Sequence, residues 1–386
     1  MGSFCWLQFS DLHLNPRVNF DTDLARAKLL EHLKNQNLKI DYIFITGDIA
    51  DKSNYNGAAE FITELMDCAK VSRKNVYWSV GNHDIDRGFK ERELFIKSIR
   101  EAKDPSEEYQ DIMSNEAYRE VMTEKAMAKY VAMYRKLFKR RLSARQTSDA
   151  HVLYPLKRVN LVVLNTCLTS CDGHDTKKLM IAEKRILRVF RRCHQKKPLF
   201  VIGHHGKSFF HEDQQKYIET LFSSYGVDIY LCGHSHKLGY ELLADGEEQK
   251  KTHQITCGGG IIDGYSSFSF FHGEYDTQNC AVRLTSHNYS EKNGEFTQRK
   301  MLVNGKESLK IRGYEPSAID LWPGFIMLLF SLMSLIPQCL RGIALLSYSF
   351  FVTVLGVLCA LGYIFWAHRK NLQPSKGRID DPRDDG

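Results

Sequence analysis

The sequence predicts an α/β protein in which polar motifs follow buried, parallel β-strands. Two observations predict this class. Hydrophobic runs of four to six residues, typical of strands buried on both faces, alternate with amphipathic segments over the first 84 residues. Five such runs along the chain are each followed by a motif that contains Asp, Asn or His. These runs occupy residues 4–9, 42–46, 76–80, 199–202 and 229–232. Because ligands of open α/β sheets bind beyond the carboxyl ends of the strands, we expect the motifs to meet at one edge.

The first 84 residues are predicted to form a β-α-β-α-β unit. Apolar residues recur at helical spacing in residues 22–35 and in residues 56–69, which lie between the first three strands. Right-handed crossovers then place the three strands side by side in a parallel sheet. A helical insertion is expected over residues 86–148, because residues 115–145 are rich in helix formers with apolar side chains at helical spacing.

Strands and helices are predicted to alternate again after the insertion. We expect strands at residues 151–155 and 161–165, and helices at residues 181–193 and 214–225. Residues 237–313 favour an all-β segment of short strands separated by Gly, Asp and Asn. The expected strands of this segment are residues 254–257, 267–272, 281–285 and 300–303.

Seven side chains in the five motifs could bind metal ions. They are Asp11, His13, Asp48, Asn82, His204, His234 and His236. Oxygen and nitrogen ligands of this kind suit Mn, Fe or Zn. Seven ligands are too many for one tetrahedral zinc, but they suit two ions about 3.5–4 Å apart that share a carboxylate. Such a pair can hold a phosphate ester and generate a bridging hydroxide that attacks phosphorus.

The ordered motifs resemble those of the calcineurin-like metallophosphoesterase superfamily, and its phosphodiesterase branch in particular. The motifs are Asp11-x-His13, Gly47-Asp48, Gly81-Asn82-His83-Asp84, Gly203-His204 and Gly233-His234-x-His236. The resemblance implies a two-sheet αββα sandwich, which we assign to residues 1–313. A member of the family that has lost its metals and its activity stays an alternative.

The resemblance also implies a role for each motif residue. Three residues would bind the first metal: Asp11, His13 and His236. Three would bind the second: Asn82, His204 and His234. Asp48 would bridge the two ions. His83 would be the catalytic proton donor to the leaving group, and Asp84 would orient His83. We expect Asp51 to hold a ring nitrogen of a ligand, and we leave the role of His205 open.

The helical insertion carries a basic stretch with three possible roles. Seven Lys or Arg residues and no acid lie between residues 129 and 145. The stretch could be a solvated helix face, a cap that attracts phosphate, or a contact with anionic lipid headgroups. Because the insertion begins at the rim of the expected site, we favour a cap that limits which phosphate ester enters.

The C-terminal segment differs from the rest of the chain. Residues 318–336 are mostly apolar, and residues 343–367 form a run of 25 residues without formal charge. Two such runs predict a two-helix transmembrane hairpin at residues 318–368, and a buried helical hairpin is the alternative. Residues 369–386 form a polar tail, of which residues 371–386 are expected to be disordered. Basic residues flank the hairpin on the side of the preceding domain, whereas Arg341 stands alone in the turn, so that side should be cytoplasmic.

Composition agrees with this placement. The ten cysteines are scattered and form no CxxC pair, which favours a reducing compartment. Cys167, Cys171 and His174 lack a fourth ligand for zinc, and we interpret the two cysteines as loop and core residues. No signal peptide is visible before the first strand. The net charge of +7 suits anionic substrates or an anionic membrane surface.

The sequence therefore predicts a phosphoesterase anchored in the cell membrane as a multi-pass protein, with its catalytic domain in the cytoplasm. It would use two divalent or trivalent metal ions to hydrolyse a phosphate ester. The expected substrate is a phosphodiester, either a nucleotide or another phosphodiester. A metal-dependent nuclease is one alternative, because the basic insertion could follow a nucleic-acid backbone. A membrane sensor that binds a nucleotide without hydrolysing it is another. The oligomeric state is not predicted.

Overall fold

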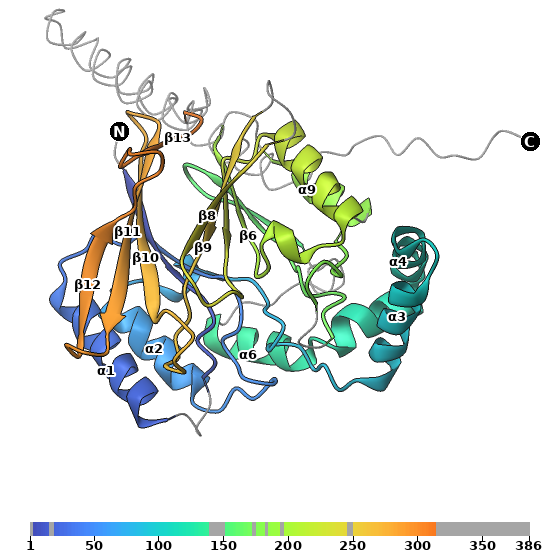
Figure 1. Cartoon of the computed structure of the whole chain (residues 1–386), viewed down its shortest axis with the longest axis horizontal. Helices are drawn as coiled ribbons and strands as arrows, with labels where there is room; N and C mark the ends of the chain where they lie inside the picture. Colours follow the sequence, from blue (N-terminus) through green and yellow to red (C-terminus); the bar gives the residue numbers. More distant parts are fainter. Residues whose placement is uncertain are drawn as a thin grey trace, which may run out of the picture. The chain divides into compact units, whose positions relative to one another are not determined.

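Two β-sheets with helices on their outer faces form the described part of the protein (Figure 1). The computed structural model describes residues 3–14, 19–138, 151–171, 175–181, 184–193, 197–244 and 250–313. The chain separates into two units, Met1–Tyr314 and Glu315–Gly386, and all described residues belong to the first.

The first sheet combines a parallel half with an antiparallel half. Its parallel strands are β1 (Phe4–Phe9), β2 (Tyr42–Ile45) and β3 (Val76–Trp78). Its antiparallel strands are β10 (Ser269–Asp276), β11 (Ala281–Ser290), β12 (Glu295–Lys300) and β13 (Leu309–Lys310). The order is β12-β11-β10-β1-β2-β3, with β13 paired to β11. Strands from the two ends of the domain therefore meet where β10 pairs with β1.

The second sheet is built from the middle of the chain. Its strands are β4 (Val152–Pro155), β5 (Asn160–Val163), β6 (Leu199–Ile202), β7 (Ile229–Cys232), β8 (Gly239–Leu243) and β9 (Thr252–Thr256). The order is β4-β5-β6-β7-β9-β8, in which β5, β6, β7 and β9 are parallel. The expectation that all motifs leave one sheet edge is therefore wrong, because β1 to β3 belong to the first sheet and β6 and β7 to the second.

Three hydrophobic layers hold the sandwich together. Aromatic side chains fill the space between the sheets, where the ring of Phe200 lies 5.4 Å from that of Trp6. Helices α1 (Phe20–Asn35) and α2 (Ala58–Cys68) cover the outer face of the first sheet. Helices α8 (Lys184–Phe190) and α9 (Glu212–Tyr225) cover the second. The predicted αββα arrangement is confirmed in the described residues.

The insertion is helical, as predicted. It contains α3 (Lys90–Glu101), α4 (Pro105–Ser114), α5 (Glu116–Glu120), a π-helical turn η2 (Val121–Lys125) and α6 (Ala128–Phe138). In α6, the hydroxyl of Tyr130 donates to the carbonyl of Trp78, and Tyr134 is buried beside it. Lys129, Arg135 and Lys136 are exposed. The described basic side chains of the stretch are therefore exposed on a helix whose other face packs in the core, and residues 139–145 lie outside the described residues. The favoured role as a cap stays a prediction.

A buried arginine ties the insertion to the second sheet. The guanidinium of Arg92, in α3, donates to the carbonyls of Cys167 and Leu168 at 3.0 Å and also to that of Ser170. These carbonyls belong to the loop after β5, which also carries Thr166. Because an unpaired buried carbonyl is costly, Arg92 holds this loop in one conformation.

The C-terminal half of the first sheet differs most from the sequence prediction. β10 and β11 extend to Asp276 and Ser290, and β12 precedes the strand expected at residues 300–303. In the second sheet, β8 was not predicted. β12 is an edge strand whose side chains are largely exposed, so its polar sequence lacks the alternation that marks a half-buried strand.

No described helix is long and apolar enough to cross a membrane. The predicted transmembrane hairpin at residues 318–368 and the polar tail at residues 369–386 lie outside the described residues.

Candidate metal centre

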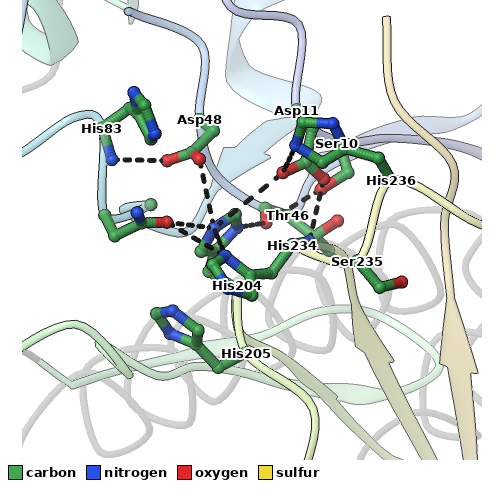
Figure 2. Close-up of polar contacts among 12 residues, drawn as sticks. Ser10, Asp11, Thr46, Asp48, His83, His204, His205, His234, Ser235 and His236 are labelled. Carbon is green, nitrogen blue, oxygen red and sulfur yellow. Dashed lines mark hydrogen bonds and ion pairs between the residues drawn. The ribbon is translucent and has the colours of Figure 1, made fainter. Parts of the chain in front are cut away.

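The seven predicted ligands lie together between the ends of the two sheets. Figure 2 shows five of them, Asp11, Asp48, His204, His234 and His236. The structure forms four overlapping groups in which the ligand atoms lie within 4.8 Å of one another. The groups are Asp11–His13–His236, Asp11–Asp48–His204, His13–Asp48–His83 and His204–His205–His234. His205, whose role was open, thus belongs to the cluster.

Unusual backbone geometry brings these side chains together. Five of the seven predicted ligands adopt positive φ angles, which non-glycine residues seldom adopt. They are Asp11, His13, Asp48, His234 and His236, with φ between 42° and 68°. Gly47 has φ of 98°, and a Cβ atom there would lie 2.5 Å from Nδ1 of His204. Strain of this kind persists where the surrounding structure fixes it and is often found at functional sites.

Asp48 lies at the centre of the cluster. Its Oδ2 atom is 3.3 Å from Nε2 of His204 and 3.8 Å from Nε2 of His13. Its Oδ1 atom accepts a hydrogen bond of 2.7 Å from the backbone N–H of His83. Asp48 therefore contacts ligands of both expected ions, which is the position required of a bridging carboxylate.

The first expected ligand group surrounds Asp11. Nε2 of His236 lies 3.2 Å from Oδ1 of Asp11 and 3.1 Å from Nε2 of His13. Oδ2 of Asp11 accepts from the backbone N–H of His234. Oδ1 is buried and has no hydrogen-bond partner of suitable geometry among the residues that the structure describes. A buried carboxylate oxygen beside two imidazole nitrogens fits a cation that all three would share.

The second expected group contains Asn82, His204 and His234. Oδ1 of Asn82 lies 2.8 Å from Nε2 of His204 and 3.1 Å from Nδ1 of His234. Nδ1 of His204 faces the carbonyl of Thr46 at 2.8 Å and must donate its proton to it. Nε2 of His204 is therefore the nitrogen that can bind a metal ion.

A turn that sequence reasoning missed orients His236. Nδ1 of His236 lies 2.8 Å from Oγ of Ser266, which donates a hydrogen bond of 2.9 Å to Oδ2 of Asp263. Ser266 Oγ therefore accepts the Nδ1 proton of His236, which leaves Nε2 as the ring nitrogen that faces Asp11 and can bind a metal ion. The residue pattern Asp263-Gly264 indicates a turn in the sequence, but not what that turn contacts.

His83 is oriented by a different residue from the one predicted. Nδ1 of His83 lies 3.0 Å from Oδ1 of Asp51, so the predicted contact with Asp84 is wrong. Asp51 was expected to hold a metal ligand and instead holds the expected proton donor. The carboxylate of Asp84 accepts from the backbone N–H groups of Asp48, Ala50 and Gly81. Asp84 thereby fixes the loops that carry Asp48 and Asn82, and burial together with Asp48 raises its pKa to about 7.

The buried carboxylates of the cluster shift the pKa of the neighbouring histidines. Burial alone would lower the pKa of His204, but the carboxylates of Asp48 and Asp11 raise it to about 9. Burial and the charge of His204 lower the pKa of His234 to about 4. In the absence of a metal ion, a proton on His204 therefore compensates the buried carboxylates, and a bound cation would displace it.

His205 is fully buried and packs against the ligand group that contains His234. Its Nδ1 atom lies 3.1 Å from Oγ1 of Thr166, and its ring packs 4.3 Å from that of His234. The same Thr166 hydroxyl accepts from the backbone N–H of His204. The loop held by Arg92 therefore positions both neighbouring histidines.

The Ser266→Ala variant should weaken metal binding by about 10- to 100-fold, because the ring of His236 loses the partner that orients it. Calorimetric titration with Mn²⁺ measures the effect. Ser235→Ala is the matched control, since the Ser235 hydroxyl donates only to the carbonyl of Lys237 among the contacts described for it. Equal affinities for both variants and the unaltered protein would contradict the assigned role of Ser266.

The sequence matches phosphoesterases in two comparisons, one with a family model and one with a bacterial relative. The family model of calcineurin-like phosphoesterases matches residues 7–238, which is more than half of the chain. The metallophosphoesterase-like protein YydB of Bacillus subtilis (strain 168) is 27% identical over 325 residues. That alignment covers 80% of this chain and 65% of YydB, so the chain spans slightly less than two thirds of this relative.

Solved structures are similar at much lower identity. A dimetal phosphatase from Danio rerio is 12% identical with a TM-score of 0.45, and the match covers 77% of this chain and 99% of that one. The purple acid phosphatase PPD1 from yellow lupin (Lupinus luteus) seeds is 13% identical with a TM-score of 0.46, covering 81% of this chain and 54% of that one.

Proposed function

Because the chain belongs to the calcineurin-like phosphoesterase family, we propose that it is a dinuclear metal-dependent phosphoesterase that hydrolyses phosphodiesters. The observation that carries the proposal is the position of Asp48, whose carboxylate lies between histidines of the two ligand groups. Mixed carboxylate, amide and imidazole ligands suit Mn, Fe or Zn. The preference for a diester rests on the resemblance of the Asn82-His83-Asp84 motif to the phosphodiesterase branch.

Two groups of residues would each hold one metal ion. Asp11, His13 and His236 would hold one ion, and Asn82, His204 and His234 the other, with Asp48 shared between them. When bound, the ions polarise the phosphate oxygens and supply a nucleophile at neutral pH.

We assign to His83 the transfer of a proton during the reaction. Its backbone N–H is fixed by Asp48, its Nδ1 by Asp51, and its ring lies 4.6 Å from that of His13. With Nδ1 donating to Asp51, the doubly protonated ring can pass its Nε2 proton to the leaving oxygen of an ester, which leaves His83 as a neutral imidazole. About a quarter of the His83 side chain is exposed, so a substrate can reach it.

The His83→Ala variant should keep its metals but lose on the order of 10²–10⁴ in kcat, because the leaving group no longer receives a proton. Asp51→Asn should cause a smaller loss in the same direction. Hydrolysis of bis(p-nitrophenyl) phosphate by the Mn²⁺-loaded protein measures both effects, and p-nitrophenyl phosphate serves as the monoester comparison. His211→Ala is the control for a histidine outside the cluster.

The same hydrolysis measurements distinguish the proposed phosphodiesterase from the alternative functions. Wild-type rates in His83→Ala would disprove its role, and faster hydrolysis of the monoester would disprove the diester preference. Metal-loaded protein that hydrolyses no ester would favour the nucleotide-binding membrane sensor. Metal-dependent cleavage of single-stranded DNA that weakens steeply with salt would favour the nuclease.

We further propose that residues 318–368 anchor the enzyme in the cell membrane with its catalytic domain in the cytoplasm. The support is the length of the two apolar runs and the excess of Lys and Arg on the side of the catalytic domain. The full chain should stay with the membrane pellet after carbonate extraction, and a chain ending at residue 313 should not. Release of the full chain by carbonate would contradict the anchor without affecting the proposed chemistry.

A further inference from the structure

An exposed aromatic ring stands beside the metal centre. Tyr265 is 64% exposed and directly precedes Ser266, the residue whose hydroxyl contacts His236. The ammonium group of Lys237, which directly follows His236, lies 3.9 Å from the centre of the Tyr265 ring. Two residues adjacent in sequence to metal-centre residues thus meet at its rim.

The loop that carries Tyr265 is fixed at several points. Oδ1 of Asp263 accepts from the backbone N–H groups of Tyr265 at 2.9 Å and Ser266 at 2.7 Å. Gly264, with φ of 74°, allows the tight turn between them. The backbone N–H of Ser267 donates to the carbonyl of His236 at 2.8 Å. Because the loop is bonded to His236 through both Ser266 and Ser267, Tyr265 keeps its place relative to the ligands.

The base of the loop is anchored to the first sheet and to helix α1. Gly260 N–H donates to the carbonyl of Asp11 at 2.9 Å. Ile262 N–H donates to Oγ1 of Thr22, and the Ile262 carbonyl accepts from Asn19. The loop is therefore preorganised, which lowers the entropic cost of using its side chains for binding.

We propose that Tyr265 and Lys237 form the part of the substrate site that recognises a nucleotide. The exposed ring offers a face on which a base can stack, a contact that tolerates any base because every base has a π-face. The ammonium group offers a compact positive charge for a phosphate oxygen. Lys237 directly follows His236, and Tyr265 directly precedes Ser266, whose hydroxyl contacts the His236 ring, so both groups lie at the rim of the metal centre. The inference rests on the proposed phosphodiesterase function and narrows its substrates to nucleotide esters.

A pair of ligands that differ only by the base tests the inference. Adenosine monophosphate (AMP) and ribose 5-phosphate share the sugar and the phosphate, so the ratio of their affinities isolates the contribution of the base. Both are titrated calorimetrically into the full, Mn²⁺-loaded chain, and both are used as inhibitors of bis(p-nitrophenyl) phosphate hydrolysis. We expect AMP to bind on the order of 10- to 100-fold more tightly than ribose 5-phosphate.

Substitutions test which side chain makes AMP bind more tightly than ribose 5-phosphate. Tyr265→Ala should reduce the ratio to near one, whereas Tyr265→Phe should retain it. Lys237→Gln should weaken both ligands alike and leave the ratio unchanged. Tyr118→Ala and Lys292→Gln are matched controls, since both residues are exposed and lie on α5 and the β11–β12 turn. Metal content is measured for each variant, and Tyr265→Leu replaces Tyr265→Ala if the latter loses metal.

The two proposals fail separately. Equal affinities of AMP and ribose 5-phosphate for the unaltered protein, or a base-dependent ratio that survives both Tyr265→Ala and Tyr265→Leu, would overturn the nucleotide subsite even if diesters are hydrolysed rapidly. Base-dependent binding without hydrolysis of any ester would support the subsite and overturn the proposed enzymatic function.

Discussion

Two carboxylates, Asp11 and Asp48, are buried side by side where the ends of the two sheets meet. Removing an ionised carboxylate from water costs several kcal/mol unless opposite charge and hydrogen bonds compensate it. Here the compensation comes from neighbouring histidines, among them His204 and His236, whose pKa values the carboxylates raise, and from backbone N–H groups. A site arranged in this way has a strong electrostatic preference for a cation, because a metal ion can replace a proton on these histidines and satisfy Oδ1 of Asp11 as well.

The fold provides this arrangement by ending strands from two sheets at one place. β1, β2 and β3 supply ligands from one side, and β6 and β7 from the other. Asp84 joins the loops after β2 and β3 through three backbone hydrogen bonds. Arg92 fixes the loop whose Thr166 supports His204 and His205. The helical insertion thus contributes to the metal centre through packing as well as through its place at the rim.

The sequence predicted the parts that depend on local pattern. Buried strands that end in polar motifs identified the seven residues that the structure places together, because a strand end fixes where the following side chains lie. Local pattern failed for contacts made by distant segments. The family resemblance implied that Asp84 orients His83, yet the His83 ring contacts Asp51, 32 residues earlier.

The hydrogen bond between Ser266 and the His236 ring is another contact that local sequence pattern did not predict. Ser266 reaches that ring because β10 pairs with β1 and brings the loop before it to the metal centre. Nothing near His236 in the sequence indicates this partner. β12 was displaced in the prediction because an edge strand with polar faces carries no alternating pattern. The C-terminal runs were predicted from composition, and their structure lies outside the described residues.

The account depends on two cations held by one shared carboxylate. Elemental analysis of metal-reconstituted protein, combined with the Asp48→Ala variant, tests this most directly. We expect two transition-metal ions for each unaltered chain, and loss of both ions together with hydrolysis in Asp48→Ala. A chain that retains no transition metal, and in which no added metal restores hydrolysis, would contradict the account.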